Sequence, residues 1–157
     1  MSEKFYNIFA IFIFIFFSIS LFLGLFLNED ASGTGTSNDF KNTWEYVLIL
    51  KSDYFIDSSG WTRLLPLHYI FLSILYEIFG SIFSVRLIFC FISLLAPFLL
   101  YLNLRLKFPQ INKGKLIILS SLLLILPFFR SSAIWPNPHV LAIIFLLASI
   151  YFFQKWQ

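Results

Sequence analysis

The chain has 157 residues, of which 59% are hydrophobic and only 12% are charged, and its mean hydropathy is +0.86. Soluble domains carry about 25% charged residues, so this composition excludes an ordinary soluble domain and indicates a membrane protein. The basic pI of 9.1 does not indicate nucleic-acid binding, because the basic residues form no patch with interleaved aromatics. The single cysteine, Cys90, lies in an apolar run and is interpreted as a small hydrophobic residue.

The first predicted element is an apolar run over residues 5–27, interrupted only by Asn7, Ser18, Ser20 and Gly24. About 20 apolar residues cross a bilayer. The run exceeds the apolar core of a signal peptide, which has about 7–15 residues, and no usual cleavage site follows it. The sequence therefore predicts an uncleaved transmembrane helix.

A long polar region follows at residues 28–66. Within it, Phe40, Trp44, Val47 and Leu48 have the spacing of a helix with one apolar face. The aromatic residues around this face are typical of the membrane surface. We expect a juxtamembrane helix near residues 40–51.

The next apolar segment, Leu67–Phe79, is short and contains Glu77. About 13 residues do not comfortably span a bilayer, so a second juxtamembrane or re-entrant helix is predicted near 66–80.

Three longer apolar segments predict further spans at residues 84–106, 115–134 and 138–156. They show neither an internal repeat nor a Gly/Pro-broken helix pair, which many transporters have. The predicted fold is an all-α membrane protein with about four transmembrane helices. Two juxtamembrane helices lie in its first extracytoplasmic loop, residues 28–83.

Charge predicts the orientation of these spans. One side of the membrane receives six basic residues and one acid, a net charge of +5: Lys4, Arg105, Lys107, Lys113, Lys115, Lys155 and Glu3. The other side receives five basic residues and seven acids, a net charge of −2. Because Lys and Arg concentrate in cytoplasmic loops, the N-terminus is predicted to be cytoplasmic, and the long loop and the Arg130–His139 turn extracytoplasmic.

This order of parts resembles the N-terminal portion of the GT-C superfamily of membrane glycosyltransferases. A first span is followed by a loop with an acid, Asp39, and by an amphipathic helix. Leu65–Leu72 resembles the family's proline- and tyrosine-rich juxtamembrane segment. The family features that follow this segment are resembled by five further stretches: Phe79-Gly80, Val85–Leu87, Tyr101–Phe108, Leu126–Arg130 and Trp135–His139. The resemblance covers nearly the whole chain but only part of a family member.

The resemblance implies transfer of a sugar from a polyprenyl-phosphate-linked donor to a lipid, glycan or protein acceptor at the extracytoplasmic face. It implies a bacterial inner-membrane location, membrane lipids as surroundings and a remaining C-terminal part as a partner. It makes Asp39 the candidate catalytic carboxylate, which would orient or deprotonate the acceptor hydroxyl. The candidates for binding the donor phosphate are Arg63, Arg130, Lys51 and His139.

Other readings of these residues remain open. Asp39 is also a suitable N-cap for the helix that follows it, and Arg63 and Lys51 can extend toward lipid headgroups. No cofactor is predicted; a divalent metal ion is possible, but the sequence has no motif for it, and Asn137 and His139 stand where the family often has an acid. The alternative function is a non-enzymatic polytopic membrane protein, either a transporter subunit or an assembly factor.

Overall fold

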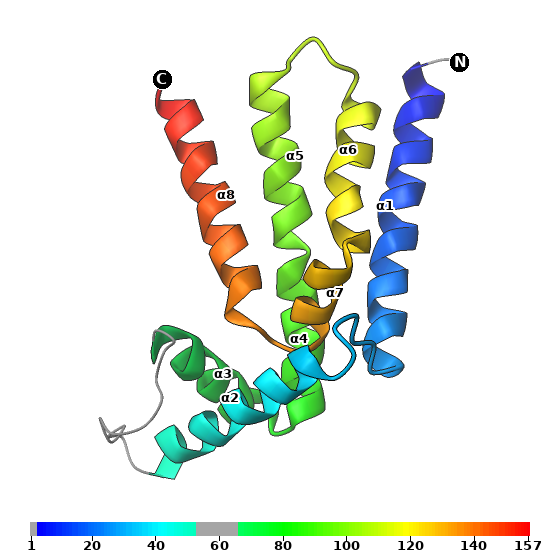
Figure 1. Cartoon of the computed structure of the whole chain (residues 1–157). Helices are drawn as coiled ribbons and strands as arrows, with labels where there is room; N and C mark the ends of the chain where they lie inside the picture. Colours follow the sequence, from blue (N-terminus) through cyan, green and yellow to red (C-terminus); the bar gives the residue numbers. More distant parts are fainter. Residues whose placement is uncertain (1–2, 53–65) are drawn as a thin grey trace.

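The computed structural model describes residues 3–52 and 66–157, with the backbone alone for residues 49–52 and 66. It is all helical in these ranges (Figure 1), which confirms the predicted all-α membrane protein. Three helical stretches are long and apolar enough to cross a membrane: Glu3–Phe26, Ile82–Lys107 and Pro138–Trp156. A bent pair, Lys113–Ile125 with Pro127–Ile134, makes a fourth when counted as one span.

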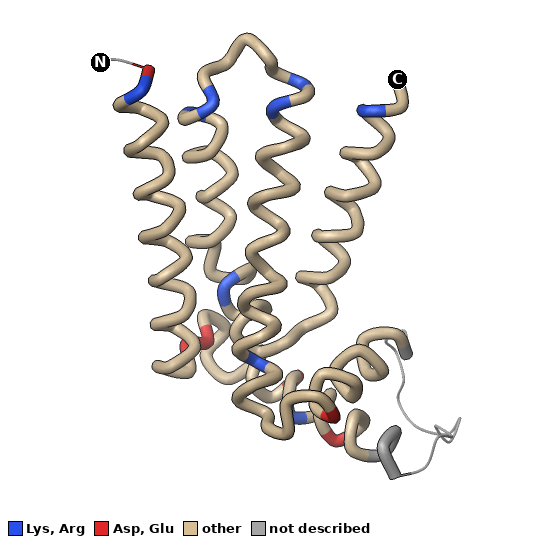
Figure 2. Tube along the Cα trace, turned by 180° about the vertical axis from the view of Figure 1, so that it is seen from behind, with Lys and Arg blue, Asp and Glu red and all other residues tan. Residues whose placement is uncertain are grey.

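Both chain termini and the turn between α5 (Leu95–Lys107) and α6 (Lys113–Ser121) lie at one end of the bundle, here called the termini end. The turns after α1 (Glu3–Phe26), before α4 (Ile82–Ser93) and before α8 (Pro138–Trp156) lie at the opposite end, here called the loop end (Figure 1). Figure 2 shows that Lys and Arg gather at the termini end, whereas acids and bases mix at the loop end.

The helices α1 and α6 pack closely along each other. A Cβ atom at Gly114 would lie 2.8 Å from the carbonyl oxygen of Tyr6. Only glycine therefore allows the start of α6 to approach the α1 backbone at this distance. Asn112 caps α6, because its side chain accepts a hydrogen bond from the Gly114 amide.

The segment predicted as the third span, residues 115–134, is a bent helix pair, contrary to the expectation of one unbroken helix. It runs through α6 and the short 3₁₀ helix η1 (Leu122–Ile125), then bends by 66° into α7 (Pro127–Ile134). Pro127 explains the break: it has no N–H to donate, and it favours an extended conformation at the residue before it. Leu126 has that conformation, with ψ of 122°.

The helices α2 (Gly35–Ser52) and α3 (Pro66–Phe79) pack against each other and project sideways from the loop end (Figure 1). Phe40, Trp44 and Val47 are buried, as the spacing predicts, whereas Leu48 is exposed. The Trp44 ring meets Tyr76 of α3 edge to face, with centroids 5.1 Å apart. The main apolar core lies at the loop end, where residues of α1, α2, α3, α4 and α7 meet.

Candidate functional site at the loop end

A partly buried ion pair joins the turn after α1 to α7. The guanidinium of Arg130 binds the Glu29 carboxylate through two nitrogens, with Nε 2.7 Å from Oε1 and Nη2 2.5 Å from Oε2. The remaining donors reach the Ser20 hydroxyl, the Ser20 carbonyl and the Leu124 carbonyl. All five N–H groups of Arg130 are therefore used. The hydrogen bond from Arg130 lowers the pKa of Glu29 below its ordinary value, although partial burial opposes this shift.

Gly24 makes room for this pair. A Cβ atom there would overlap Glu29 Oε2, and it would lie 2.9 Å from Arg130 Nη2. A glycine is thus needed at this position in the first span because the ion pair packs against it. Its backbone carbonyl also accepts a hydrogen bond from the Glu29 amide at 2.8 Å.

Asp30 organises the turn into α2. Its carboxylate accepts hydrogen bonds from the amides of Ser32 and Ser37 and from the Ser32 hydroxyl. The Ser32 hydroxyl oxygen in turn accepts a hydrogen bond from the Thr36 amide. Burial raises the pKa of Asp30, but these hydrogen bonds outweigh it and lower the pKa to about 2. The first turn of α2 is therefore capped by Ser32 and Asp30.

Arg86 of α4 forms a second buried cationic centre. It donates from Nε to the Ile134 carbonyl and from Nη1 to Asn28 Oδ1, both at 2.9 Å. Its guanidinium lies 3.7 Å above the centre of the Trp135 ring, a cation–π contact. Trp135 in turn donates from its indole nitrogen to the Glu29 carbonyl.

The positive charge of Arg86 has no carboxylate partner among the residues that the structure describes, where the Arg130–Glu29 pair is the only salt bridge. Nη2 of Arg86 is buried without a hydrogen-bond partner there. The loop end thus holds two buried guanidiniums against one paired carboxylate. This unneutralised charge favours a negatively charged group nearby.

His68 connects α3 to the turn between α7 and α8, which also contains Trp135. Its Nε2 lies 3.3 Å from the Pro136 carbonyl, and its Nδ1 is buried with no partner in the described part of the chain. Burial lowers the pKa of His68 to about 4, with a further small effect of the nearby His139. His68 is therefore neutral near pH 7. Its ring also meets Phe89 edge to face, with centroids 6.1 Å apart.

Asp39 lies inside α2, not at its start, so the expectation that it caps this helix is wrong. The helix begins at Gly35, and Ser32 and Asp30 bind the first amides. The side chain of Asp39 is exposed and makes no hydrogen bond or ion pair with another described residue. The next residue, Phe40, packs on Trp135 with ring centroids 5.9 Å apart. Asp39 is therefore adjacent in sequence to a residue that packs on Trp135, while its own side chain is exposed.

The candidate phosphate-binding residues do not form one cluster in the described structure. Arg130 is buried in the ion pair with Glu29, and His139 is exposed on the first turn of α8, with its ring 5.4 Å from that of Phe128. Lys51 belongs to α2, but its side chain lies outside the described residues, as does all of Arg63. Their role in phosphate binding stays a prediction. In the described ranges, no three His, Cys, Asp or Glu side chains gather where they could hold a metal ion.

Sequence reasoning missed the partners of the two buried arginines. In the sequence, Glu29 and Asp30 are most simply interpreted as the polar end of the first span, and Arg86 as a residue that extends toward lipid headgroups. A signal was available, because ionisable residues at membrane depth are usually paired. The sequence alone did not say that Glu29 pairs with a residue 101 positions away.

No protein-family model matches this chain, and no curated protein or solved structure is significantly similar to it.

Proposed function

We propose that this chain is the N-terminal part of a membrane glycosyltransferase of the GT-C type. It would transfer a sugar from a polyprenyl-phosphate-linked donor to a lipid, glycan or protein acceptor. The loop end would face the extracytoplasmic side of a bacterial inner membrane. The charge distribution supports this orientation, because the termini end carries almost only basic residues.

The observation that carries the proposal is that the Asp39 side chain has no binding partner among the described residues. Its carboxylate is exposed, and the next residue, Phe40, packs on Trp135. A carboxylate used only for structure would be expected to bind amides or a cation, as Asp30 and Glu29 do. A free one remains able to accept a proton from a substrate.

The reaction assigned to this site is a substitution at the anomeric carbon. The acceptor oxygen forms a bond to that carbon while the bond to the lipid phosphate breaks. Asp39 takes the proton of the acceptor hydroxyl, and the lipid phosphate leaves with the bonding electrons. Such a mechanism needs the carboxylate within about 2.6–3.2 Å of the hydroxyl in the bound state.

The leaving phosphate gains negative charge and needs nearby cations. Arg130 would have to give up Glu29 or Ser20 to bind it, because all five of its donors are used. Within the proposal this role therefore falls first to His139, Lys51 and Arg63. The buried charge of Arg86 adds a favourable potential at the same end.

The test compares Asp39→Asn with Glu45→Gln, which removes another exposed carboxylate from the same helix. Membranes containing each variant are incubated with a panel of synthetic polyprenyl-phosphate hexoses, and release of polyprenyl phosphate is measured by chromatography. We expect Asp39→Asn to lower the rate by at least about 100-fold, the low end for loss of a general base. Glu45→Gln should retain the rate of the unaltered protein.

Equal rates for Asp39→Asn and the unaltered protein, at equal amounts of folded protein, would refute the role of Asp39. Failure of the unaltered full-length protein to release polyprenyl phosphate from any donor would refute the glycosyltransferase proposal. That outcome would leave the non-enzymatic membrane protein as the better reading.

A further inference from the structure

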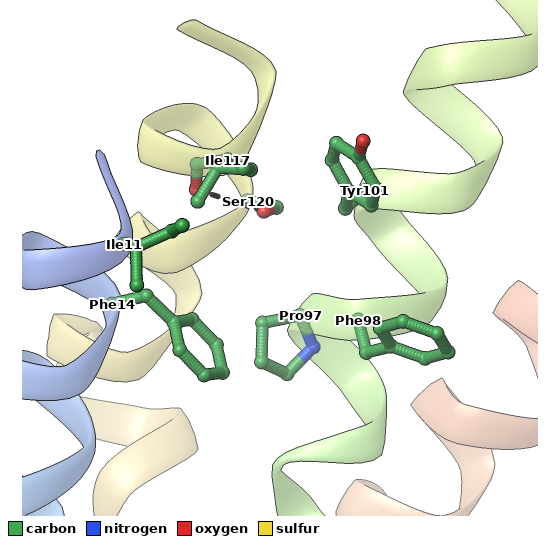
Figure 3. A pocket seen from close by; sticks show the side chains of 7 residues that line it. All are labelled: Ile11, Phe14, Pro97, Phe98, Tyr101, Ile117 and Ser120. Atoms are coloured by element: carbon green, nitrogen blue, oxygen red, sulfur yellow. Dashed lines mark hydrogen bonds between the residues drawn. The ribbon is translucent and has the colours of Figure 1, made fainter. Parts of the chain in front are cut away.

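A cavity of about 250 Å³ lies between α1, α5 and α6, in the half of the bundle nearer the termini end (Figure 3). Its walls are almost entirely apolar and include Phe14, Ile117 and the ring of Tyr101. Ile11 and Phe98 also line it and are 51% and 52% exposed. The cavity therefore opens on the outer surface of the bundle, where the acyl chains of the membrane lie.

Basic residues surround the termini end above this cavity. Lys113 and Lys115 begin α6, and Lys113 is four residues from Ile117, which corresponds to about 6 Å along the helix. Both lysines are exposed, and neither forms a salt bridge within the described ranges. Lys4, at the start of α1, lies at the same end (Figure 2).

The apolar cavity and the lysines above it are complementary to a molecule that has an apolar chain and a charged headgroup. An acyl chain fits an apolar cavity that opens sideways to the bilayer. A negatively charged headgroup at the end of that chain would meet Lys113, one helical turn from Ile117 on the same face of α6, and Lys4, two turns from Ile11 on the same face of α1. A zwitterionic headgroup has no net charge to complement these lysines.

We propose that this cavity binds one anionic phospholipid of the surrounding membrane. One acyl chain lies between Ile11, Phe98 and Ile117, and the headgroup phosphate lies at Lys113 and Lys4. The site is separate from the loop end and does not depend on the proposed glycosyltransferase activity. The lipid fills a space between α1 and α5 that their own side chains leave open.

Native mass spectrometry of the full chain tests this site, with phosphatidylglycerol and phosphatidylcholine of identical acyl chains added to detergent micelles. The unaltered protein should retain one phosphatidylglycerol in preference to phosphatidylcholine. The variant Lys4→Gln/Lys113→Gln should bind phosphatidylglycerol about 25-fold more weakly, since each lysine near a charged lipid contributes about fivefold. The matched variant Lys107→Gln/Lys155→Gln removes two charges from α5 and α8 and should bind normally.

A second pair of variants tests the cavity itself. Ile11→Trp should fill the cavity and prevent retention, whereas Ile19→Trp, at a residue of similar exposure on the same helix, should not. Helicity measured by circular dichroism checks that each variant is folded. Equal retention of the two lipids, equal effects of the two lysine pairs, or normal binding by folded Ile11→Trp would each overturn the proposal.

Discussion

Gly24→Ala gives the sharpest test of the loop-end structure, because two effects of the substitution have opposite signs. Alanine favours a helix over glycine by about 1 kcal/mol, so a free site in the middle of α1 would be stabilised. At Gly24, however, the new methyl group would overlap Glu29 Oε2 and crowd Arg130 Nη2. The ends of these side chains must then shift, which weakens the Arg130–Glu29 pair.

The size of the loss follows from the geometry of the pair. Two charge-assisted hydrogen bonds are involved, and each contributes roughly 1.5–3 kcal/mol. The Glu29 side chain is 34% exposed, so water screens the interaction and the low end applies. After subtraction of the helix-propensity gain, loss of both hydrogen bonds would destabilise Gly24→Ala by about 2 kcal/mol, and we expect a net destabilisation up to this value.

A double-mutant cycle with Glu29→Ala isolates the cause. Without the Glu29 carboxylate the overlap disappears, so Gly24→Ala should then be neutral or stabilising by up to about 1 kcal/mol. The free energy of unfolding is measured by titration with sodium dodecyl sulfate in mixed micelles, followed by circular dichroism. Stabilisation by Gly24→Ala in the otherwise unaltered chain, or an equal cost in both backgrounds, would refute this reasoning.

Three further predictions concern the same end of the bundle. Arg86→Lys should destabilise the protein by about 1–3 kcal/mol in the same titration, because lysine keeps the charge but cannot both stack on Trp135 and reach Ile134 and Asn28; a change below about 0.5 kcal/mol would contradict this. The pKa of His68 is lowered to about 4, so the unfolded chain binds a proton before the folded one does. Stability should therefore fall as the pH decreases from about 6.5 to 4, and His68→Phe should flatten that part of the pH profile. Asp30→Asn should cost about 1 kcal/mol at pH 7 by weakening the hydrogen bonds at the start of α2. The pKa of Asp30 is lowered to about 2, so its contribution is lost only as the pH falls from about 4 to 2. The difference between Asp30→Asn and the unaltered protein should vanish there.

Apolar length and helical periodicity, both local properties of the sequence, determined much of this fold. The run after Phe5 and the stripe of Phe40, Trp44 and Val47 predicted helices that the structure contains. These patterns are local because a helix in a bilayer makes all its backbone hydrogen bonds within itself. Its side chains then need to match only the lipid or the bilayer surface around it. The break at Pro127 was also readable from the local chemistry of proline, although the third span was predicted to be unbroken.

Long-range pairing was decided only by the tertiary structure. Glu29 meets Arg130, Trp135 covers Arg86, and Asp30 has the capping role that was one of two readings of Asp39. Polar side chains in one sequence have many partners of compatible chemistry, and only the packing of α1, α4 and α7 selects among them. Gly24 shows the same limit, because its missing side chain matters only once Glu29 and Arg130 are placed against it. The sequence by itself determined which segments are long and apolar enough to cross a membrane. The packing of the helices decided which charges neutralise one another and which, like Asp39, have no partner in the part of the chain that the structure describes.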